Sequence, residues 1–91
     1  MAKMTRREDE IVLALDGEWE LVERAYGSVG GWRNLKLYRH AKRRDVRKRT
    51  WFLSWNGERF ARSSDCGILA NHYPDRLEWV QREMGGENGQ G

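Results

Sequence analysis

The stretch that decides the fold is residues 32–62, which reads WRNLKLYRHAKRRDVRKRTWFLSWNGERFAR. It contains two runs that alternate apolar and polar residues, a basic segment between them, and an Asn56-Gly57 pair near its end. An Asn-Gly pair between alternating residues is a strong hairpin signal, because both residues tolerate the positive φ of a type I′ turn. A two-residue loop at this pair predicts a strand that returns toward Arg62.

That loop sets the register of the predicted hairpin. The expected pairs are Trp55 with Glu58, Leu53 with Phe60, and Trp51 with Arg62. Because side chains alternate across a sheet, the apolar members of these pairs share one face, which we expect to form the core. These core residues are Trp51, Leu53, Trp55 and Phe60.

The run from Trp32 to Ala41 predicts the preceding strand, joined to the next through a turn centred near Asp45. The expected pairs are Leu37 with Leu53, Leu35 with Trp55, and Arg39 beside Trp51, where a cation–π contact is reasonable. The opposite face then collects polar and aromatic side chains beside the basic segment. These are Lys36, Tyr38, His40, Lys42, Lys48, Thr50, Phe52 and Arg59.

The flanks complete an α+β domain with an antiparallel sheet of about four strands and C-terminal helices on one face. Residues 11–22 predict a hairpin around Asp16-Gly17, although a capping box at Thr5 also allows a helix through Leu15. After Arg62, residues 63–65 offer N-cap candidates for a short helix over 66–72. Pro74 suits the first turn of a second helix. The apolar stripe of that helix is Leu77, Val80 and Met84, and Gly85-Gly86 ends it.

Length and composition indicate one small domain over residues 1–91, with 1–9 and 85–91 as flexible tails. A single cysteine excludes an internal disulfide. No apolar run approaches the ~20 residues that span a bilayer, and no signal-peptide pattern follows the N-terminus. These features predict a cytoplasmic protein without a membrane partner.

Positive charge is concentrated in one segment. The chain has a net charge of +3, whereas residues 39–49 contain seven Lys or Arg residues and one acid, Asp45, so the remainder is acidic. A Lys/Arg-rich hairpin connection can follow nucleic-acid phosphates with salt-dependent affinity. The other interpretation is a solvated loop that blocks edge pairing. Aromatic rings on the same face favour the first, because exposed rings beside cations stack on unpaired bases, unless the N-terminal segment covers them.

No catalytic or metal-binding pattern stands out. Cys66 and His72 are six residues apart, so a helix does not place them on one face, and structural zinc normally takes four ligands. No GxSxG or phosphate-binding glycine pattern occurs, and the glycines of residues 26–31 fit a connector better than a phosphate cradle. The sequence therefore predicts a binding module that is not an enzyme and needs no cofactor or metal.

Two resemblances accompany this interpretation. The segment TWFLSWNGERFARSSDCGILANHYPDRLEWV (residues 50–80) resembles small uncharacterised proteins of phage and prophage genomes. The order of antiparallel strands before a C-terminal helix is similar to the AP2-like DNA-binding domain of phage integrases, which uses its sheet to enter the DNA groove. That architectural resemblance implies that Lys36, Tyr38, Arg59 and the 42–49 loop face DNA. A phage origin equally implies an inhibitor that binds a host protein.

The predicted function is contact with the phosphates of DNA or RNA through the basic hairpin and the adjoining sheet face. The predicted nucleic-acid-binding residues are Lys36, Tyr38, Arg39, His40, Lys42, Arg43, Arg44, Arg47, Lys48, Arg49, Phe52 and Arg59. The alternative is a protein–protein inhibitor or adaptor that acts on a host factor through Trp79, Trp32 and the helix surface. For both tryptophans, packing against the fold is the competing interpretation, with Trp79 beside Arg76 or Arg82.

Overall fold

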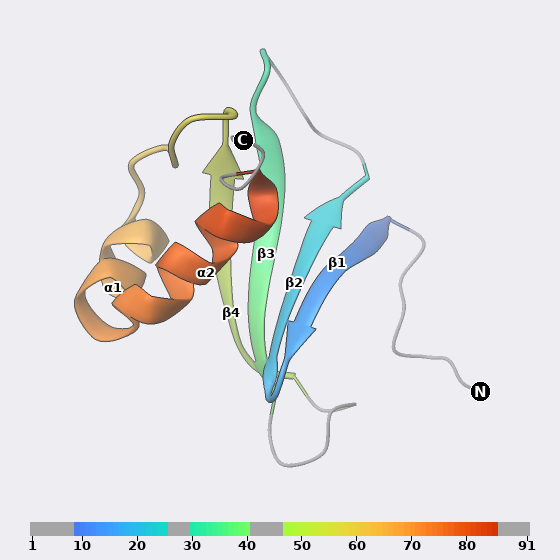
Figure 1. Ribbon diagram of the computed structural model, residues 1–91, viewed down its shortest axis with the longest axis vertical. Coiled ribbons are helices and arrows are strands. Elements are labelled where there is room, and N and C mark those ends of the chain that lie inside the picture. The colour runs from blue at the N-terminus through green and yellow to red at the C-terminus, as the bar shows by residue number, and fades with distance from the viewer. Residues whose placement is uncertain (1–8, 26–29, 41–46, 86–91) are drawn as a thin grey trace.

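The structure, a computed structural model, describes residues 9–25, 30–40 and 47–85. Its elements in chain order are β1 (Glu10–Asp16), β2 (Trp19–Arg24), β3 (Arg33–His40), β4 (Arg47–Trp55), α1 (Ser64–His72) and α2 (Pro74–Met84). The strands form one antiparallel sheet in the order β1-β2-β3-β4, and both helices lie against the same face of it (Figure 1). The predicted α+β fold is confirmed. Apart from Asp9 and Gly85, the predicted tails lie outside the described residues.

β1 and β2 form the hairpin predicted around Asp16-Gly17, so the helical alternative for this segment is wrong. The last pair of the ladder is Asp16 with Trp19, which leaves Gly17 and Glu18 as the connection. Gly17 has a φ of 62°, in the left-handed region that glycine adopts without steric cost. The glycine of the predicted pair thus lies in the turn, whereas Asp16 ends β1 and the two-residue connection is displaced by one residue from the predicted one.

β3 and β4 also pair as predicted, but their register differs from the expected one by two residues. The observed pairs include Leu35 with Leu53, Leu37 with Trp51, and Arg39 with Arg49. The side-chain period of a strand is two, so a shift of two residues leaves the side chains from Arg33 to Arg39 on their predicted faces. Beyond Arg39 a bulge interrupts this register and pairs His40 with Arg47. The identity of the core face is therefore confirmed, whereas the predicted pairs Leu37 with Leu53, Leu35 with Trp55, and Arg39 beside Trp51 are wrong.

The connection after β4 is longer than the Asn56-Gly57 pair predicts, and the expected return strand reduces to a bridge between Trp55 and Phe60. The Oδ1 atom of Asn56 accepts hydrogen bonds from the backbone N–H groups of Glu58 (2.8 Å) and Arg59 (2.9 Å). This side-chain cap replaces the two-residue turn. The predicted pairs Trp55 with Glu58, Leu53 with Phe60, and Trp51 with Arg62 are therefore wrong. Phe60 still packs on the core, with its ring centroid 4.9 Å from that of Trp55.

The two helices begin and end at the predicted signals. Ser63 is the N-cap of α1, and its Oγ accepts a hydrogen bond from the backbone N–H of Cys66 at 3.1 Å. Pro74 occupies the first turn of α2, where its missing N–H has no intrahelical partner to lose. Tyr73 joins the helices, and Gly85 ends α2 with a φ of 146°.

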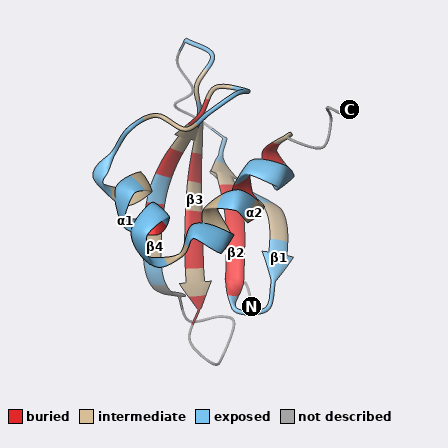
Figure 2. Ribbon diagram, turned by 60° about the vertical axis from the view of Figure 1, so that its left-hand side comes forward, coloured by how far each residue is buried: buried red, intermediate tan, exposed pale blue. Residues whose placement is uncertain are grey.

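The core lies between the helices and the sheet, as the burial colours in Figure 2 show. Val80 and Met84 of the predicted α2 stripe are buried there, and Leu77 packs beside them. Full burial of one such apolar side chain contributes about 1.5–3 kcal/mol. The buried cluster comprises Trp19, Leu21, Leu35, Leu37, Trp51, Leu53, Trp55, Leu69, Val80 and Met84.

Aromatic rings close one end of this core. Trp19 and Trp51 stack with their ring centroids 5.6 Å apart. Tyr73, between the two helices, meets both rings edge-on, at 5.2 Å from Trp19 and 5.6 Å from Trp51. Edge-to-face pairs of this kind add about 0.5–1.5 kcal/mol beyond the area they bury. Tyr73 therefore fixes the junction of α1 and α2 against the sheet.

Candidate functional site

The face of the sheet turned away from the helices, which we call the outer face, carries most of the predicted site residues. On it, Lys36 faces Phe52 and Tyr38 faces Thr50. Tyr38 and His40 are each only 3% exposed, whereas Phe52 is 53% exposed. The prediction that these residues all lie open beside the basic segment is therefore wrong for Tyr38 and His40.

The buried Tyr38 hydroxyl donates a hydrogen bond to a carboxylate of β1. Glu10 is 2% exposed, and its Oε2 accepts a hydrogen bond from the Tyr38 hydroxyl at 2.7 Å. Lys36 Nζ donates to the same oxygen at 3.1 Å. A buried carboxylate requires such donors to offset its lost hydration. The alternative that the N-terminal segment covers the rings thus holds for Tyr38, which contacts β1, and not for Phe52.

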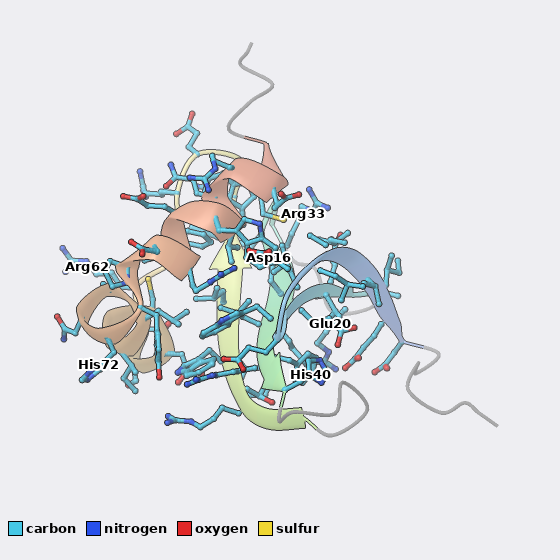
Figure 3. All side chains as sticks on the ribbon, turned by 60° about the horizontal axis from the view of Figure 1, so that its bottom comes forward. Asp16, Glu20, Arg33, His40, Arg62 and His72 are labelled. Carbon is cyan, nitrogen blue, oxygen red and sulfur yellow. The ribbon has the colours of Figure 1, made fainter. Side chains whose placement is uncertain are left out.

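The imidazole of His40 is likewise hydrogen-bonded to a carboxylate of β2. Its Nε2 lies 2.6 Å from Oε1 of Glu20, and both side chains are buried (Figure 3). The pair joins β2 to the end of β3, where the basic segment begins. His40 therefore has a structural role at the base of this hairpin, and we remove it from the set of candidate ligand contacts.

Arg39 lies on the opposite, helix-covered face and contacts protein groups on three sides. Its Nε donates to Glu18 Oε2 at 2.7 Å, and its Nη1 donates to the Tyr73 hydroxyl at 3.0 Å. Its guanidinium carbon is 5.6 Å from the ring centroid of Trp19. The hydrogen bond to Glu18 raises the pKa of Arg39 above its ordinary value. Arg39 therefore has a structural role, because its guanidinium group contacts other residues of the protein.

The cations beyond His40 form the remaining part of the predicted site. Lys42, Arg43 and Arg44 lie outside the described residues. Arg47 and Lys48 belong to β4, and the last pair between β3 and β4 joins His40 to Arg47. Arg49 is exposed, with its guanidinium carbon 5.0 Å above the Trp51 ring. The described part of the chain places no carboxylate against Arg49.

Phe52 presents an exposed ring at the centre of the outer face of β4. Lys36 Nζ lies 5.6 Å from its ring centroid, within the range of a cation–π contact. The backbone N–H of Phe52 donates to Asp65 Oδ2 at 2.7 Å, so the start of α1 holds this part of the edge strand. The neighbouring residues Trp51 and Leu53 are buried on the other face. The ring is thus attached to a firmly held backbone.

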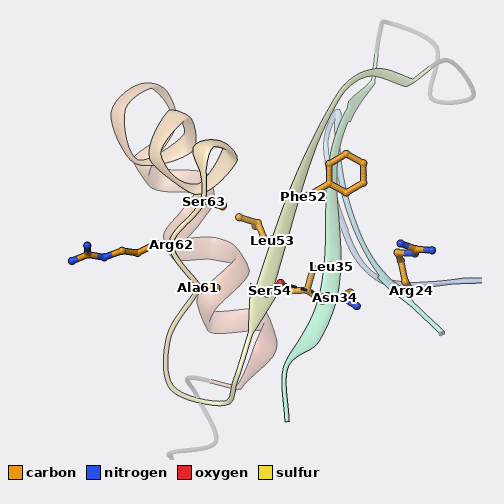
Figure 4. A pocket seen from close by; sticks show the side chains of 9 residues that line it. All are labelled: Arg24, Asn34, Leu35, Phe52, Leu53, Ser54, Ala61, Arg62 and Ser63. Carbon is orange, nitrogen blue, oxygen red and sulfur yellow. Dashed lines mark hydrogen bonds between the residues drawn. The ribbon is translucent and has the colours of Figure 1, made fainter. Parts of the chain in front are cut away.

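A cavity of about 290 Å³ adjoins Phe52 along the edge of the sheet. Figure 4 shows Phe52 and Arg24 on the same side of the sheet, while Arg62 lies on the other side and points away. Arg24 is exposed at the end of β2, and sequence reasoning did not include it in the site. The β2–β3 register, which brings Arg24 level with Asn34, could not be read from the sequence. The lining residues are Arg24, Asn34, Leu35, Phe52, Leu53, Ser54, Ala61, Arg62 and Ser63.

Arg59 is separated from the basic segment by the length of β4. It follows Trp55 at one end of the strand, whereas the β4 part of the basic segment begins at Arg47, at the other end. The nine residues of β4 rise about 3.3 Å each, so these ends are roughly 26 Å apart. The predicted position of Arg59 in a return strand is wrong, because residues 56–59 form the connection after β4 and the bridge to that strand begins at Phe60.

The tryptophans of the alternative hypothesis are partly buried. Trp79 packs against the core cluster, with the guanidinium carbon of Arg76 5.2 Å from its ring centroid. This confirms the interpretation of Trp79 as a ring folded beside Arg76. Trp32, which precedes β3, is half-buried.

Cys66 is half-buried against the core cluster, and this burial raises the pKa of its thiol above the ordinary value. The thiol is therefore less nucleophilic at neutral pH than an exposed one. Across residues 9–25, 30–40 and 47–85, no cluster of three His, Cys, Asp or Glu side chains has a metal-binding arrangement. Within the same ranges, neither helix has the length and apolar character needed to cross a bilayer.

Comparisons of the chain with protein-family models, with curated proteins and with solved structures give no match.

Proposed function

We propose that this chain is a non-enzymatic module that binds nucleic-acid phosphates through the basic β3–β4 hairpin and the adjoining outer face. The observation that supports the proposal is how charge is distributed along this hairpin. At its base, Arg39 is paired with Glu18 and His40 with Glu20. The sequence beyond His40 continues with six Lys or Arg residues and one acid up to Arg49. Cations in such excess attract phosphates by releasing condensed counterions.

We propose fewer nucleic-acid contacts than the sequence predicts, because several of the predicted residues already contact other parts of the protein. Tyr38, His40 and Arg39 are used by the fold, and Arg59 lies at the far end of β4. Lys36 is also used by the fold, because its ammonium group pairs with the buried Glu10. The proposed contacts are therefore Lys42, Arg43, Arg44, Arg47, Lys48, Arg49 and Phe52. A protein–protein role through Trp79 has less support, because that ring packs on the core beside Arg76.

The direct test is fluorescence anisotropy with labelled DNA and RNA over a range of salt concentrations. With roughly four to six phosphate contacts, affinity should fall about 10²- to 10³-fold between about 50 mM and 200 mM salt. Affinity that is indifferent to salt, or no binding even at low salt, would contradict the proposal.

A matched pair of charge reversals tests the location of the contacts. Arg43→Glu with Arg44→Glu should abolish most binding and lower the salt slope by about two phosphate contacts. Arg59→Glu with Arg82→Glu changes the net charge equally, at exposed positions away from the basic segment. That control variant should keep the wild-type dependence of affinity on salt concentration. Equal losses in both variants would point to nonspecific attraction by net charge instead of a local interface.

A further inference from the structure

We infer that the nucleic-acid ligand is single-stranded and that one unpaired base stacks on Phe52, with a neighbouring phosphate bound by Arg24. This inference rests on the proposed function and specifies its ligand. The inference depends on side chains of the outer face that stay exposed to solvent. Among the described residues of this face, Phe52 is the large aromatic side chain that remains exposed, because Tyr38 is buried against Glu10.

The surroundings of Phe52 suit a nucleobase. The ring stands beside Lys36, whose ammonium group also contacts Glu10, so this cation is held in place next to the ring. The bond from the Phe52 N–H to Asp65 fixes the backbone that carries the ring. A ring on a fixed backbone loses little conformational freedom when a flat ligand stacks on it. Base–aromatic stacking tolerates any sequence, since every base has a π-face.

A positively charged side chain, Arg24, lies on the same side of the sheet as the Phe52 ring. Arg24 and Phe52 line the same cavity and lie on the same side of the sheet (Figure 4). In the described part of the chain, the Arg24 guanidinium makes no ion pair or side-chain hydrogen bond. Because β3 lies between β2 and β4, a strand that leaves the basic segment along β4 meets Phe52 midway and reaches Arg24 by crossing β3. Duplex DNA cannot offer a base to this ring, because its bases are stacked within the helix.

The first experiment compares two probes of equal phosphate count, oligothymidylate and the same strand with abasic residues, in anisotropy titrations. Wild type should prefer the base-bearing strand. Phe52→Leu, which keeps apolar bulk without a ring, should lower that preference about five- to 150-fold and leave abasic binding unchanged. Phe52→Trp should restore the preference. Unchanged denaturation midpoints would show that the variants fold.

The second experiment tests Arg24. Arg24→Gln should weaken both probes and lower the salt slope by about 0.7, the value for one phosphate of a single strand. Arg82→Gln, at an exposed position on α2, should leave both affinities unchanged. A salt slope that Arg24→Gln leaves unchanged would refute the phosphate contact at Arg24.

The outcomes separate this inference from the proposed function. If wild type binds the abasic strand or a duplex of equal phosphate count as tightly as oligothymidylate, stacking on Phe52 is refuted while phosphate binding stands. An equal loss for both single strands in Phe52→Leu refutes it as well. If no strand binds at low salt, the proposed function fails, and the inference fails with it.

Discussion

Arg76 of α2 donates a hydrogen bond of 2.7 Å from Nη1 to Oδ2 of Asp16, at the end of β1. Its guanidinium carbon also lies 5.2 Å from the ring centroids of both Trp19 and Trp79. One side chain thus connects the first hairpin of the sheet to the last helix of the chain. Sequence reasoning expected Arg76 only as a neighbour of Trp79.

Arg76→Ala should therefore lower the free energy of unfolding by about 1–2 kcal/mol, because two cation–π contacts are lost together. Arg76→Lys should recover only part of this, since an ammonium group lacks the planar surface that stacks on two rings. Urea unfolding followed by far-ultraviolet circular dichroism measures the free energy of unfolding of both variants. Arg82→Ala on the same helix should stay within about 0.5 kcal/mol of wild type. Equal stability of Arg76→Lys and wild type would show that stacking contributes nothing.

Removal of the Tyr38 hydroxyl should leave the buried Glu10 carboxylate short of a donor. We expect Tyr38→Phe to lower the free energy of unfolding by about 1–3 kcal/mol. Tyr73→Phe makes the same chemical change at a half-buried ring whose hydroxyl accepts from Arg39. It should cost less, about 0.5–1.5 kcal/mol. Chemical denaturation of both variants allows the comparison, and a larger loss at Tyr73 would show that burial of Glu10 does not govern the cost.

The ion pair between Glu23 and Arg33 should make stability depend on pH in the acidic range. Arg33 donates Nε to Oε2 at 2.9 Å and Nη2 to Oε1 at 2.6 Å. The hydrogen bond from Arg33 lowers the pKa of Glu23 below its ordinary value of 4.5, against the opposing effect of burial. A carboxyl group with a lowered pKa in the folded state stabilises the fold fully above pH 4.5. That stabilisation is lost as the pH falls below 4.5 through the folded pKa.

Glu23→Gln should therefore be less stable than wild type near neutral pH, and the difference should shrink as the pH falls below 4.5. Arg33→Gln removes the cause of the shift and should reduce the same pH dependence. Thermal unfolding at a series of pH values measures these differences. A constant difference between Glu23→Gln and wild type across this range would contradict a lowered pKa for Glu23 in the folded state.

The N-cap of α1 provides a matched pair of adjacent serines. Ser63→Ala should lower the free energy of unfolding by about 1 kcal/mol, because Cys66 N–H loses its hydrogen-bond acceptor. Ser64→Ala, one residue into the helix, lacks this contact and should change stability by less than about 0.5 kcal/mol. Denaturant unfolding distinguishes them. Similar losses at both positions would mean that helix propensity, not capping, controls the effect.

Local signals in the sequence predicted much of this fold. Asp16-Gly17, Ser63 and Pro74 each act within a few residues, so their effects on the hairpin and the helices could be read directly. The core face was also predicted, because alternation survives the two-residue error in the register of β3 and β4. The Asn56 turn was mispredicted because its side chain bonds to the two N–H groups of Glu58 and Arg59, and composition alone does not reveal that competition.

The candidate site was harder to predict because its residues depend on partners distant in sequence. Nothing near Tyr38 indicates that Glu10 binds its hydroxyl, and nothing near His40 indicates Glu20. Arg24 joins Phe52 only through the pairing of β2 with β3. The basic segment itself was evident from composition, whereas the choice of which neighbouring groups remain exposed required three-dimensional contacts.

The meandering strand order has a kinetic consequence. Each strand pairs with the one before it in the chain, so the sheet can assemble through short loop closures, which favours rapid folding. The contact between Asp16 and Arg76 joins residues 60 positions apart and should form only after the hairpins exist. Substitutions at Arg76 should then accelerate unfolding and leave the refolding rate nearly unchanged.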